Sequence, residues 1–196
     1  MKSALQNIRH LDLAEIETHV EKLGEKKFRA RQVYDWIWLK QARSFEEMTN
    51  LSKEFRATLS NNFTLPSLST DATQYSDDGT VKSRFRTHDG HLVEGVLIPT
   101  DTRNTACVSS QIGCSLSCKF CATGYIERKR NLDYDEIYDE VALLNDQSEK
   151  IYGKKLSNIV FMGMGEPLLN YKNVLKAIER IASPDGMGMS PRRITV

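Results

Sequence analysis

The chain has 196 residues, 40% of them hydrophobic, and its 27 basic and 26 acidic residues leave a net charge of +1. This length has room for one ordinary domain, or for a small domain plus part of a larger one, and the apolar content is sufficient for a buried core. No apolar run approaches the roughly 20 residues of a membrane-spanning helix, and residues 1–10 lack a signal-peptide core. We therefore expect a cytoplasmic globular protein, in a compartment where thiols stay reduced.

Residues 1–65 are expected to form a small helical domain. Apolar positions recur at helical spacing over residues 13–23 and stop at Gly24, a typical residue at a helix end. A second helix is predicted over residues 25–42. Ser44 and Glu47 have the spacing of a capping box. The remaining prediction for this domain is a short helix with Ser52 as its N-cap and with Phe55 and Leu59 on its buried side.

Basic residues surround the predicted apolar face of the second helix, and Asp35 is the only acidic residue between Lys26 and Arg43. A solvated surface is the commoner explanation of such a cluster, but cations beside aromatic rings also suit RNA phosphates and bases. The predicted apolar face comprises Phe28, Trp36, Ile37 and Leu39. The cations are Lys26, Lys27, Arg29, Arg31, Lys40 and Arg43. The cluster is therefore consistent with nucleic-acid contact but does not by itself indicate it.

Residues 66–100 alternate between apolar and polar positions, which predicts an antiparallel β meander leading into the core. Glycine-containing turn sequences at residues 77–79 and 88–90 separate its strands. The expected strands lie near 71–76, 80–87 and 91–98.

Glu94 shares a face of the third expected strand with Val96 and Ile98. A carboxylate on an apolar face is costly to ionise unless it is paired, and this property favours a role in proton transfer. Two other interpretations are open. The face is exposed to solvent, or Glu94 pairs with Arg84 or Arg86 across the hairpin.

Residues 101–196 alternate between strand and helix, which predicts a parallel sheet with ligands bound at the carboxyl ends of its strands. The expected elements are a strand over 105–110, a helix capped by Asp133 and Glu136, a strand over 156–162 and a helix that begins at Asn170. The cysteine-rich loop and residues 163–167 both follow such strands, so we expect these two loops to be neighbours.

Three of the four cysteines, Cys114, Cys118 and Cys121, lie within residues 113–123. Three thiolates leave one iron of a 4Fe-4S cluster open for another ligand, whereas structural zinc takes four protein ligands. With Cys107 included, the chain could instead make a closed zinc site in an RNA-binding module without catalysis. The spacing favours the cluster and leaves the zinc alternative open.

The spacing Cys-x3-Cys-x2-Cys, with Phe120 before the last cysteine, resembles the signature of the radical S-adenosylmethionine (radical SAM) superfamily. Phe120 could equally be a core ring packed beneath the loop. Residues 92–99, 107–121 and 161–168 together resemble the RlmN family of adenine-C2 RNA methyltransferases, and this resemblance covers nearly the whole chain. The related Cfr enzymes, which methylate adenine C8, usually have Ala where this chain has Pro167.

The resemblance implies a role for each matching residue. The three clustered cysteines would hold a 4Fe-4S cluster whose free iron binds S-adenosyl-L-methionine. Gly165 and Glu166 would lie at the methionine end of that cofactor, with Phe120 in the same site. Cys107 would form a transient disulfide bond with a methyl-carrying cysteine, and Glu94 would accept a proton.

The resemblance also implies an α/β fold, in which a helical RNA-binding accessory domain over residues 1–65 and a β meander precede an incomplete radical SAM (β/α) barrel over residues 101–196. It implies 23S rRNA and tRNA as substrates, an electron donor such as flavodoxin, and a monomer. A complete barrel needs about six βα units, and these residues supply two and the start of a third. No cysteine follows Cys121. We therefore expect an N-terminal fragment that transfers no methyl group by itself.

Overall fold

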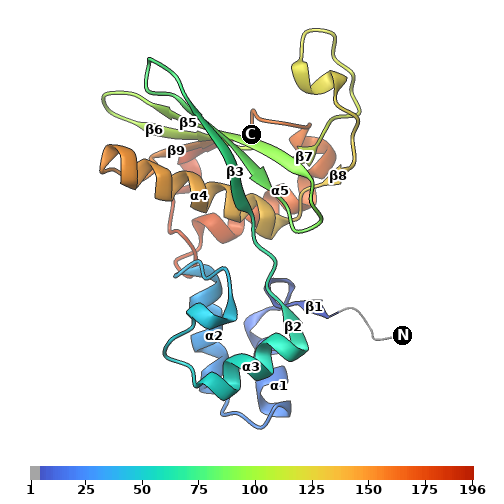
Figure 1. The fold of residues 1–196 in the computed structure, drawn as a ribbon, viewed down its shortest axis with the longest axis vertical. Helices are drawn as coiled ribbons and strands as arrows, with labels where there is room; N and C mark the ends of the chain where they lie inside the picture. The colour runs from blue at the N-terminus through green and yellow to red at the C-terminus, as the bar shows by residue number, and fades with distance from the viewer. Residues whose placement is uncertain (1–4) are drawn as a thin grey trace. The chain divides into compact units, whose positions relative to one another are not determined.

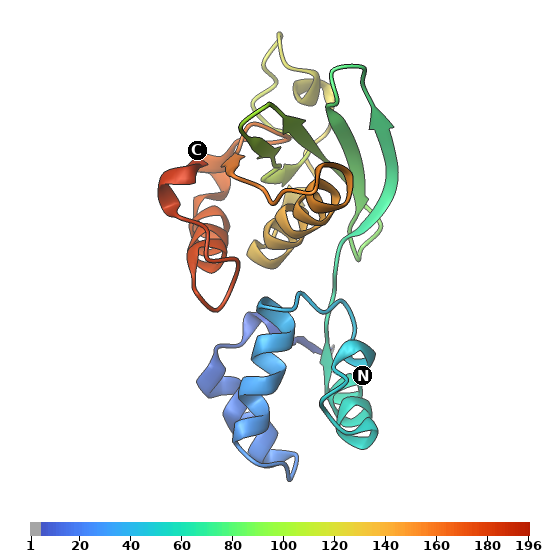
Figure 2. The ribbon, with the colours of Figure 1, turned by 90° about the vertical axis from the view of Figure 1, so that its left-hand side faces the viewer.

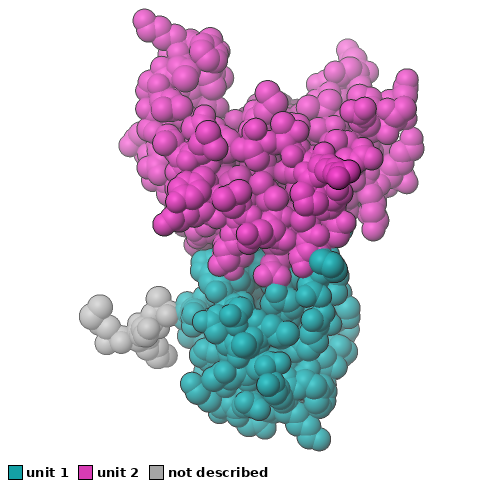
Figure 3. Space-filling view, turned by 180° about the vertical axis from the view of Figure 1, so that it is seen from behind, with its two compact units in different colours: residues 1–66, 184–187 teal, residues 67–183, 188–196 magenta. Residues whose placement is uncertain are grey.

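The computed structural model describes residues 5–196, which divide into two compact units (Figure 3). Unit 1 comprises the residues up to Pro66 together with 184–187, and unit 2 comprises residues 67–183 and 188–196. The part of the signal-peptide expectation that concerns residues 1–4 lies outside the described residues. Within residues 5–196, no helix combines the length and apolar character that crossing a bilayer requires.

Unit 1 is helical. Its helix α1 begins at a capping box, in which Asp12 accepts the backbone N–H of Glu15 and Glu15 accepts that of Asp12, both at 2.8 Å. The predicted N-cap Ser52 is confirmed, because its hydroxyl accepts the N–H of Phe55 at 3.1 Å. The elements are β1 (Gln6–Asn7), η1 (Ile8–His10), α1 (Leu13–Lys22), α2 (Phe28–Trp38), η2 (Phe45–Glu47), α3 (Lys53–Asn62) and β2 (Phe63–Thr64).

Helix α2 turns a different side to the core than the sequence predicts. Ile37 is buried as expected, but Phe28 is 54% exposed and Leu39 is 44% exposed. These two residues lie at the ends of the helix, where Phe28 is its first residue and Leu39 its C-cap. The core contacts come instead from Ala30, Val33, Tyr34, Ile37 and Trp38.

The predicted capping box at Ser44 is also wrong. The Ser44 hydroxyl lies 3.4 Å from the Glu47 carboxylate instead of accepting a backbone N–H, and a single 3-10 turn follows.

Unit 2 contains a six-stranded sheet in the order β10-β9-β6-β5-β4-β3 (Figure 1). The three strands of the meander pair antiparallel, β5 pairs antiparallel with β6, and β6, β9 and β10 run parallel. The predicted meander is confirmed. The predicted domain boundaries stay predictions, and strands on both sides of residue 100 belong to this sheet. The strands are β3 (Ser69–Tyr75), β4 (Val81–Arg86), β5 (Leu92–Pro99), β6 (Asn104–Cys107), β9 (Asn158–Val160) and β10 (Ile194–Thr195).

Helix α4 (Tyr134–Tyr152) packs against β5 and β6, and α5 (Tyr171–Ala182) lies beside α4 (Figure 2). The strand side chains that build this core share one face of the sheet by their register. They include Val81, Phe85, Val93, Leu97, Ala106 and Ile159, all fully buried. The alternation of strands and helices confirms the α/β class, and no barrel closes within the described residues.

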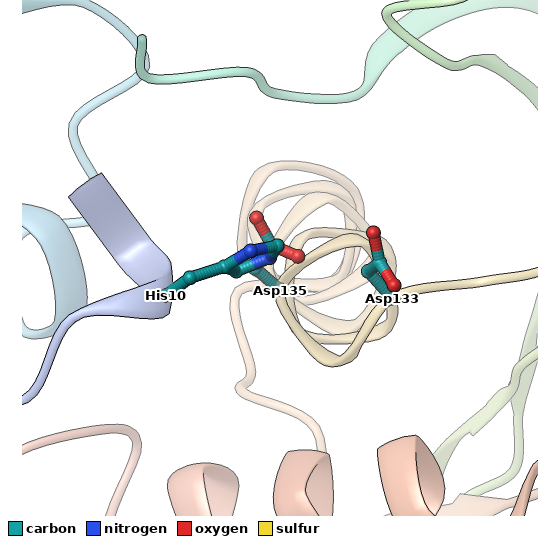
Figure 4. Close-up of side chains that lie close together, drawn as sticks. All are labelled: His10, Asp133 and Asp135. Carbon is teal, nitrogen blue, oxygen red and sulfur yellow. The ribbon is translucent and has the colours of Figure 1, made fainter. Parts of the chain in front are cut away.

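Both helices of unit 2 begin where the sequence predicts. Asp133 and Glu136 form the predicted capping box of α4, with the Asp133 N–H donating to Glu136 at 2.9 Å. Asp133 and Asp135 mark the first turn of this helix (Figure 4). Asn170 precedes α5 without capping it, because its side-chain amide donates to the carbonyls of Ser110 and Leu132, both at 2.8 Å.

Candidate functional site

The cysteine loop extends from a short hairpin. Strands β7 (Gln111–Ile112) and β8 (Arg130–Asn131) pair antiparallel, and residues 113–129 form the projecting segment between them (Figure 1, yellow). Cys114, Cys118 and Cys121 all lie on this segment and are partly exposed. Its turns are closed by the Cys121 N–H, which donates to the Cys118 carbonyl at 3.0 Å, and by the Cys114 N–H, which donates to the Ile126 carbonyl at 3.3 Å.

Gly113 makes the compact loop possible. Its φ is +73°, and a Cβ at this position would lie 2.2 Å from the carbonyl oxygen of Glu127 on the opposite side of the loop. Only glycine fits that conformation and that approach without a shift of the backbone. The close approach of the two sides of the loop therefore depends on Gly113.

The cysteine sulfurs are not gathered as closely as a closed zinc site requires. Tetrahedral zinc, with Zn–S bonds of about 2.3 Å, requires sulfurs about 3.8 Å apart. Among the described residues, no three cysteine sulfurs all lie within 4.8 Å of one another. A cluster binds each thiolate to a separate iron and accommodates wider spacing.

Cys121 has the environment of a metal-binding thiolate. Backbone N–H groups of Gly124 and Thr123 point to its sulfur and lower the pKa of its thiol. The thiolate is the form that binds metal, so this loop favours the ligand state even without a metal.

Phe120 is not a core ring. It is 94% exposed, because the loop that carries it projects from the hairpin and no layer of the unit covers it. The prediction that the ring packs beneath the loop is therefore wrong. Its role beside a cofactor stays a prediction.

Residues 163–166 lie against the segment that leads into the cysteine loop, which confirms that the two loops are neighbours. The Gly163 N–H donates to Val108 at 3.0 Å, the Ser110 N–H to Met164 at 2.8 Å, and the Glu166 N–H to the Gln111 side chain at 2.9 Å. The predicted strand over 105–110 ends earlier, at Cys107, because the backbone N–H groups of Ser109 and Ser110 bond to Glu140 and Met164 instead of a neighbouring strand.

The glycines of this loop serve its packing on that segment. Gly165 has a φ of +90°, and a Cβ there would lie 2.4 Å from the Gln111 side chain. A Cβ on Gly163 would lie 2.7 Å from the Ser109 hydroxyl. Glu166 caps the turn η4 (Pro167–Asn170) by accepting the Leu168 N–H at 3.0 Å. The roles of Gly165 and Glu166 at a cofactor stay predictions.

Glu94 and Cys107 share the face of the sheet that lies opposite α4. Cys107 on β6 is paired with Val96 on β5, and Glu94 precedes Val96 by two residues. Diagonal neighbours of this kind have Cα atoms about 7–8 Å apart. Burial raises the pKa of the Cys107 thiol, and a hydrogen bond from the Met162 backbone N–H partly opposes that shift.

Glu94 is not on a buried apolar face. The buried face of β5 carries Val93 and Leu97, and the Glu94 side chain is 41% exposed and pairs with Lys82 at 2.8 Å. The interpretation of an exposed face is the one confirmed. The expected pairing with Arg84 or Arg86 is wrong, because both arginines bind Asp71 on β3. A hollow of about 180 Å³ at Glu94 is lined by Ala72, Gln74, Lys82, Arg84 and Glu94.

Ser109 and Glu140 also belong to this region, although the sequence motifs do not single them out. Glu140 on α4 is fully buried, and its carboxylate oxygens accept the Ser109 N–H at 3.0 and 3.2 Å. Glu140 lies between Ile137 and Leu144 at helical spacing, so an acidic residue in the apolar stripe was a signal that could have revealed it.

The basic cluster of unit 1 combines paired cations with cations stacked on rings. Lys27 pairs with Glu17 at 3.0 Å. The Lys40 ammonium lies 3.9 Å from the centre of the Trp36 ring, and the Arg29 guanidinium lies 5.0 Å from that of the exposed Phe28. Stacking of this kind presents both charge and a π-face. RNA binding by this surface stays a prediction.

We expect iodoacetamide to alkylate Cys121 at least about tenfold faster than Cys107 at neutral pH, because thiolate content controls the rate. The pKa of the Cys121 thiol is lowered by backbone N–H groups, whereas that of Cys107 is raised by burial. Mass spectrometry of peptides from the metal-free chain measures both rates. The urea-unfolded chain is the control and should show similar rates. Similar rates in the folded chain would contradict the assigned environments.

Comparison with known proteins assigns a class to each region. A family model described as the ribosomal RNA large subunit methyltransferase N-terminal domain matches residues 6–65, and the radical SAM superfamily model matches residues 108–195. The crystal structure of a radical SAM methyltransferase from Sphaerobacter thermophilus is similar, with a TM-score of 0.86 and 38% identity, over 97% of this chain and 56% of that one. These findings place residues 108–195 in the radical SAM superfamily, a class that uses a 4Fe-4S cluster and S-adenosyl-L-methionine.

Curated relatives identify the family within this class. A probable dual-specificity RNA methyltransferase RlmN from Cytophaga hutchinsonii is 57% identical over 189 residues, which are 96% of this chain and 52% of that protein. The dual-specificity RNA methyltransferase RlmN from Geotalea uraniireducens is 43% identical over 97% of this chain and 54% of its own length. The chain belongs to the RlmN family, as its motifs predict. It spans about half the length of the curated relatives it matches.

Proposed function

We propose that this chain supplies the RNA-binding and cofactor-binding half of an RNA methyltransferase that acts on adenine C2 in 23S rRNA and tRNA. The observation that carries the proposal is the register of β5 and β6, with Glu94 and Cys107 on one face. Beside it, residues 163–166 bond to the segment that leads into the cysteine loop. A proton acceptor, a thiol and a cofactor site are the groups that this reaction requires.

The three clustered cysteines would hold the 4Fe-4S cluster, with Gly165, Glu166 and Phe120 toward S-adenosyl-L-methionine. Once bound, these groups supply radical chemistry, which the non-acidic hydrogen on adenine C2 makes necessary. The lowered pKa of the Cys121 thiol supports its role as a ligand.

Glu94 would accept the proton that leaves adenine C2 when the new carbon–carbon bond is complete. Its carboxylate lines the 180 Å³ hollow and is held by Lys82 at 2.8 Å. The ion pair with Lys82 fixes where the carboxylate lies at the edge of this hollow. Cys107 would lose its proton and form a disulfide bond with the methyl-carrying cysteine, as the bond between that cysteine's sulfur and the transferred carbon breaks. The Met162 N–H stabilises the resulting thiolate.

The partners follow from the same proposal. RNA would contact the stacked cations of unit 1, and reduction of the cluster would need an electron donor such as flavodoxin. We propose that the protein acts as a monomer in the cytoplasm, where its thiols stay reduced.

Anaerobic reconstitution with iron and sulfide tests the metal assignment. We expect a brown chain that retains its iron in Cys107→Ser and loses at least about nine-tenths of it in Cys118→Ala, because only the second change removes a ligand. Iron analysis and absorption spectra measure the result. A colourless chain with about one zinc, lost in Cys107→Ser, would contradict the proposal.

The target atom is tested in the complete protein. Mass spectrometry of RNA nucleosides should show 2-methyladenosine, and 8-methyladenosine would contradict the proposed regiochemistry. The 196-residue chain is the control and should give neither product.

A further inference from the structure

A single buried carboxyl group connects three segments of the proposed site. Glu140 is fully buried, and both of its oxygens lie within hydrogen-bonding distance of the Ser109 N–H. A buried polar group is costly unless it is hydrogen-bonded, so this bond fixes the backbone at residue 109.

The Ser109 side chain hydrogen-bonds to two neighbouring segments, strand β5 and the 163–166 loop. Its hydroxyl donates to the backbone carbonyl of Glu94 at 2.6 Å and accepts the N–H of Met164 at 2.8 Å. The segment after Cys107, the strand that carries Glu94 and the 163–166 loop therefore meet at one side chain.

Strand β5 has a glycine, Gly95, where the Glu140 carboxyl group packs against it. A Cβ on Gly95 would lie 2.9 Å from Oε1 of Glu140 and 2.8 Å from the Phe85 ring. Only glycine admits Glu140 and Phe85 together at this point. Burial raises the pKa of the Glu140 carboxyl well above its ordinary value, which favours the neutral acid inside the core.

We propose that Glu140 is a positioning residue that, through Ser109, holds Glu94, Cys107 and the 163–166 loop in their relative places. This inference rests on the proposed function, because it concerns the alignment of the residues assigned to that reaction. Glu140 touches no substrate or cofactor in this role. It acts through the backbone of residue 109 and the hydroxyl of Ser109.

Neighbouring Asp139 provides a matched control. It is also a buried acid on α4, and it accepts a backbone N–H, that of Leu68, at 3.0 Å. Leu68 lies outside the three segments of the site. A merely structural role for Glu140 would make Glu140→Leu and Asp139→Leu equivalent, whereas a positioning role separates them.

Hydrogen exchange of the metal-free 196-residue chain tests the proposal. In Glu140→Leu we expect the amides of residues 109 and 164 to exchange at least about tenfold faster, since the loss of one buried hydrogen bond has about that effect. Cys107 should be alkylated faster as well. Glu140→Gln keeps an acceptor of the same size, so its exchange rates should stay within about threefold of the unsubstituted chain. Asp139→Leu should lower thermal stability without changing these two amides.

Ser109→Ala keeps the test valid if Glu140→Leu does not fold. This change removes the hydroxyl and keeps the N–H that bonds to Glu140, so the Met164 amide should exchange faster while the amide at position 109 stays protected. Unchanged exchange at residue 164 in Ser109→Ala, or equal effects of Glu140→Leu and Asp139→Leu, would overturn the proposal. These measurements use no metal, so they are independent of the iron analysis that tests the proposed function.

Discussion

Replacing Gly113 with alanine is expected to prevent iron incorporation and to lower the free energy of unfolding by about 3 kcal/mol. The new Cβ would lie 2.2 Å from the carbonyl oxygen and 2.6 Å from the carbonyl carbon of Glu127, and neither backbone atom can move without opening the loop. The left-handed φ of +73° adds its own cost for any residue with a Cβ. Because Cys114 follows directly, the movement displaces a proposed cluster ligand. Urea unfolding and iron analysis after anaerobic reconstitution measure the two effects.

Gly90 is the control that separates the cost of the left-handed backbone from the cost of the clash with Glu127. Its φ is +85°, but a Cβ there would meet no atom within 4 Å. Gly90→Ala should therefore cost only about 1 kcal/mol from backbone conformation and leave iron incorporation intact. If Gly113→Ala behaved like Gly90→Ala in both measurements, the described approach of the loop to Glu127 would be incorrect.

Replacing Arg130 with methionine is expected to lower the free energy of unfolding by about 3 kcal/mol, because it leaves a buried carboxylate without its cation. Arg130 donates to Asp89 at 2.7 and 2.9 Å and to Glu136 at 2.6 and 2.7 Å. The Glu136 side chain is only 7% exposed. Arg130 joins the turn before β5, the hairpin strand β8 and the start of α4, so its loss should loosen the base of the cysteine loop. Thermal and urea unfolding measure the change.

The effect should depend on pH in a defined direction. Arg130 holds the pKa of Asp89 well below its ordinary value, so the ionised form is favoured in the folded state. At acidic pH, Asp89 therefore binds more protons in the unfolded chain than in the folded chain. The contribution of ionised Asp89 to folding stability is complete above the ordinary pKa of aspartate, about 4. It is lost as the pH falls below that value toward the pKa of Asp89 in the folded state. The difference between the original chain and Arg130→Met should therefore shrink in acid.

Lys129 is the matched control for this prediction. It pairs with Glu127 on the surface, one residue away from Arg130. Exposed pairs contribute little, so Lys129→Met should change stability by less than about 1 kcal/mol. Equal losses from both substitutions would show that burial of Glu136 does not set the cost.

Short-range patterns of the sequence were sufficient for much of the fold. The C-terminal end of α1, the start of α4, the turns of the meander and the N-cap Ser52 all follow from hydrogen bonds within about four residues, and such bonds leave a direct trace in residue order. The motifs of residues 92–99, 107–121 and 161–168 together likewise indicated the family. Local chemistry and spacing are properties of the chain itself.

The expectations that failed depended on which side of an element is covered. Phe120 and Phe28 are exposed, and Glu94 faces away from the core, because period alone does not say which of two faces another element covers. The same limit concealed the roles of Asp139 and Glu140 on α4, which are buried and accept N–H groups from distant segments.

The sequence by itself therefore determined the class, the elements and the ligand-type residues, since these depend on neighbours along the chain. The tertiary structure decided that Glu94 and Cys107 share a face, that the 163–166 loop bonds to the segment before the cysteine loop, and that Ser109 and Glu140 connect this segment to β5 and α4. The hydrogen bonds of Ser109 join residues that lie 15 to 55 positions apart in sequence. Only packing of the sheet against α4 brings such distant groups within hydrogen-bonding distance.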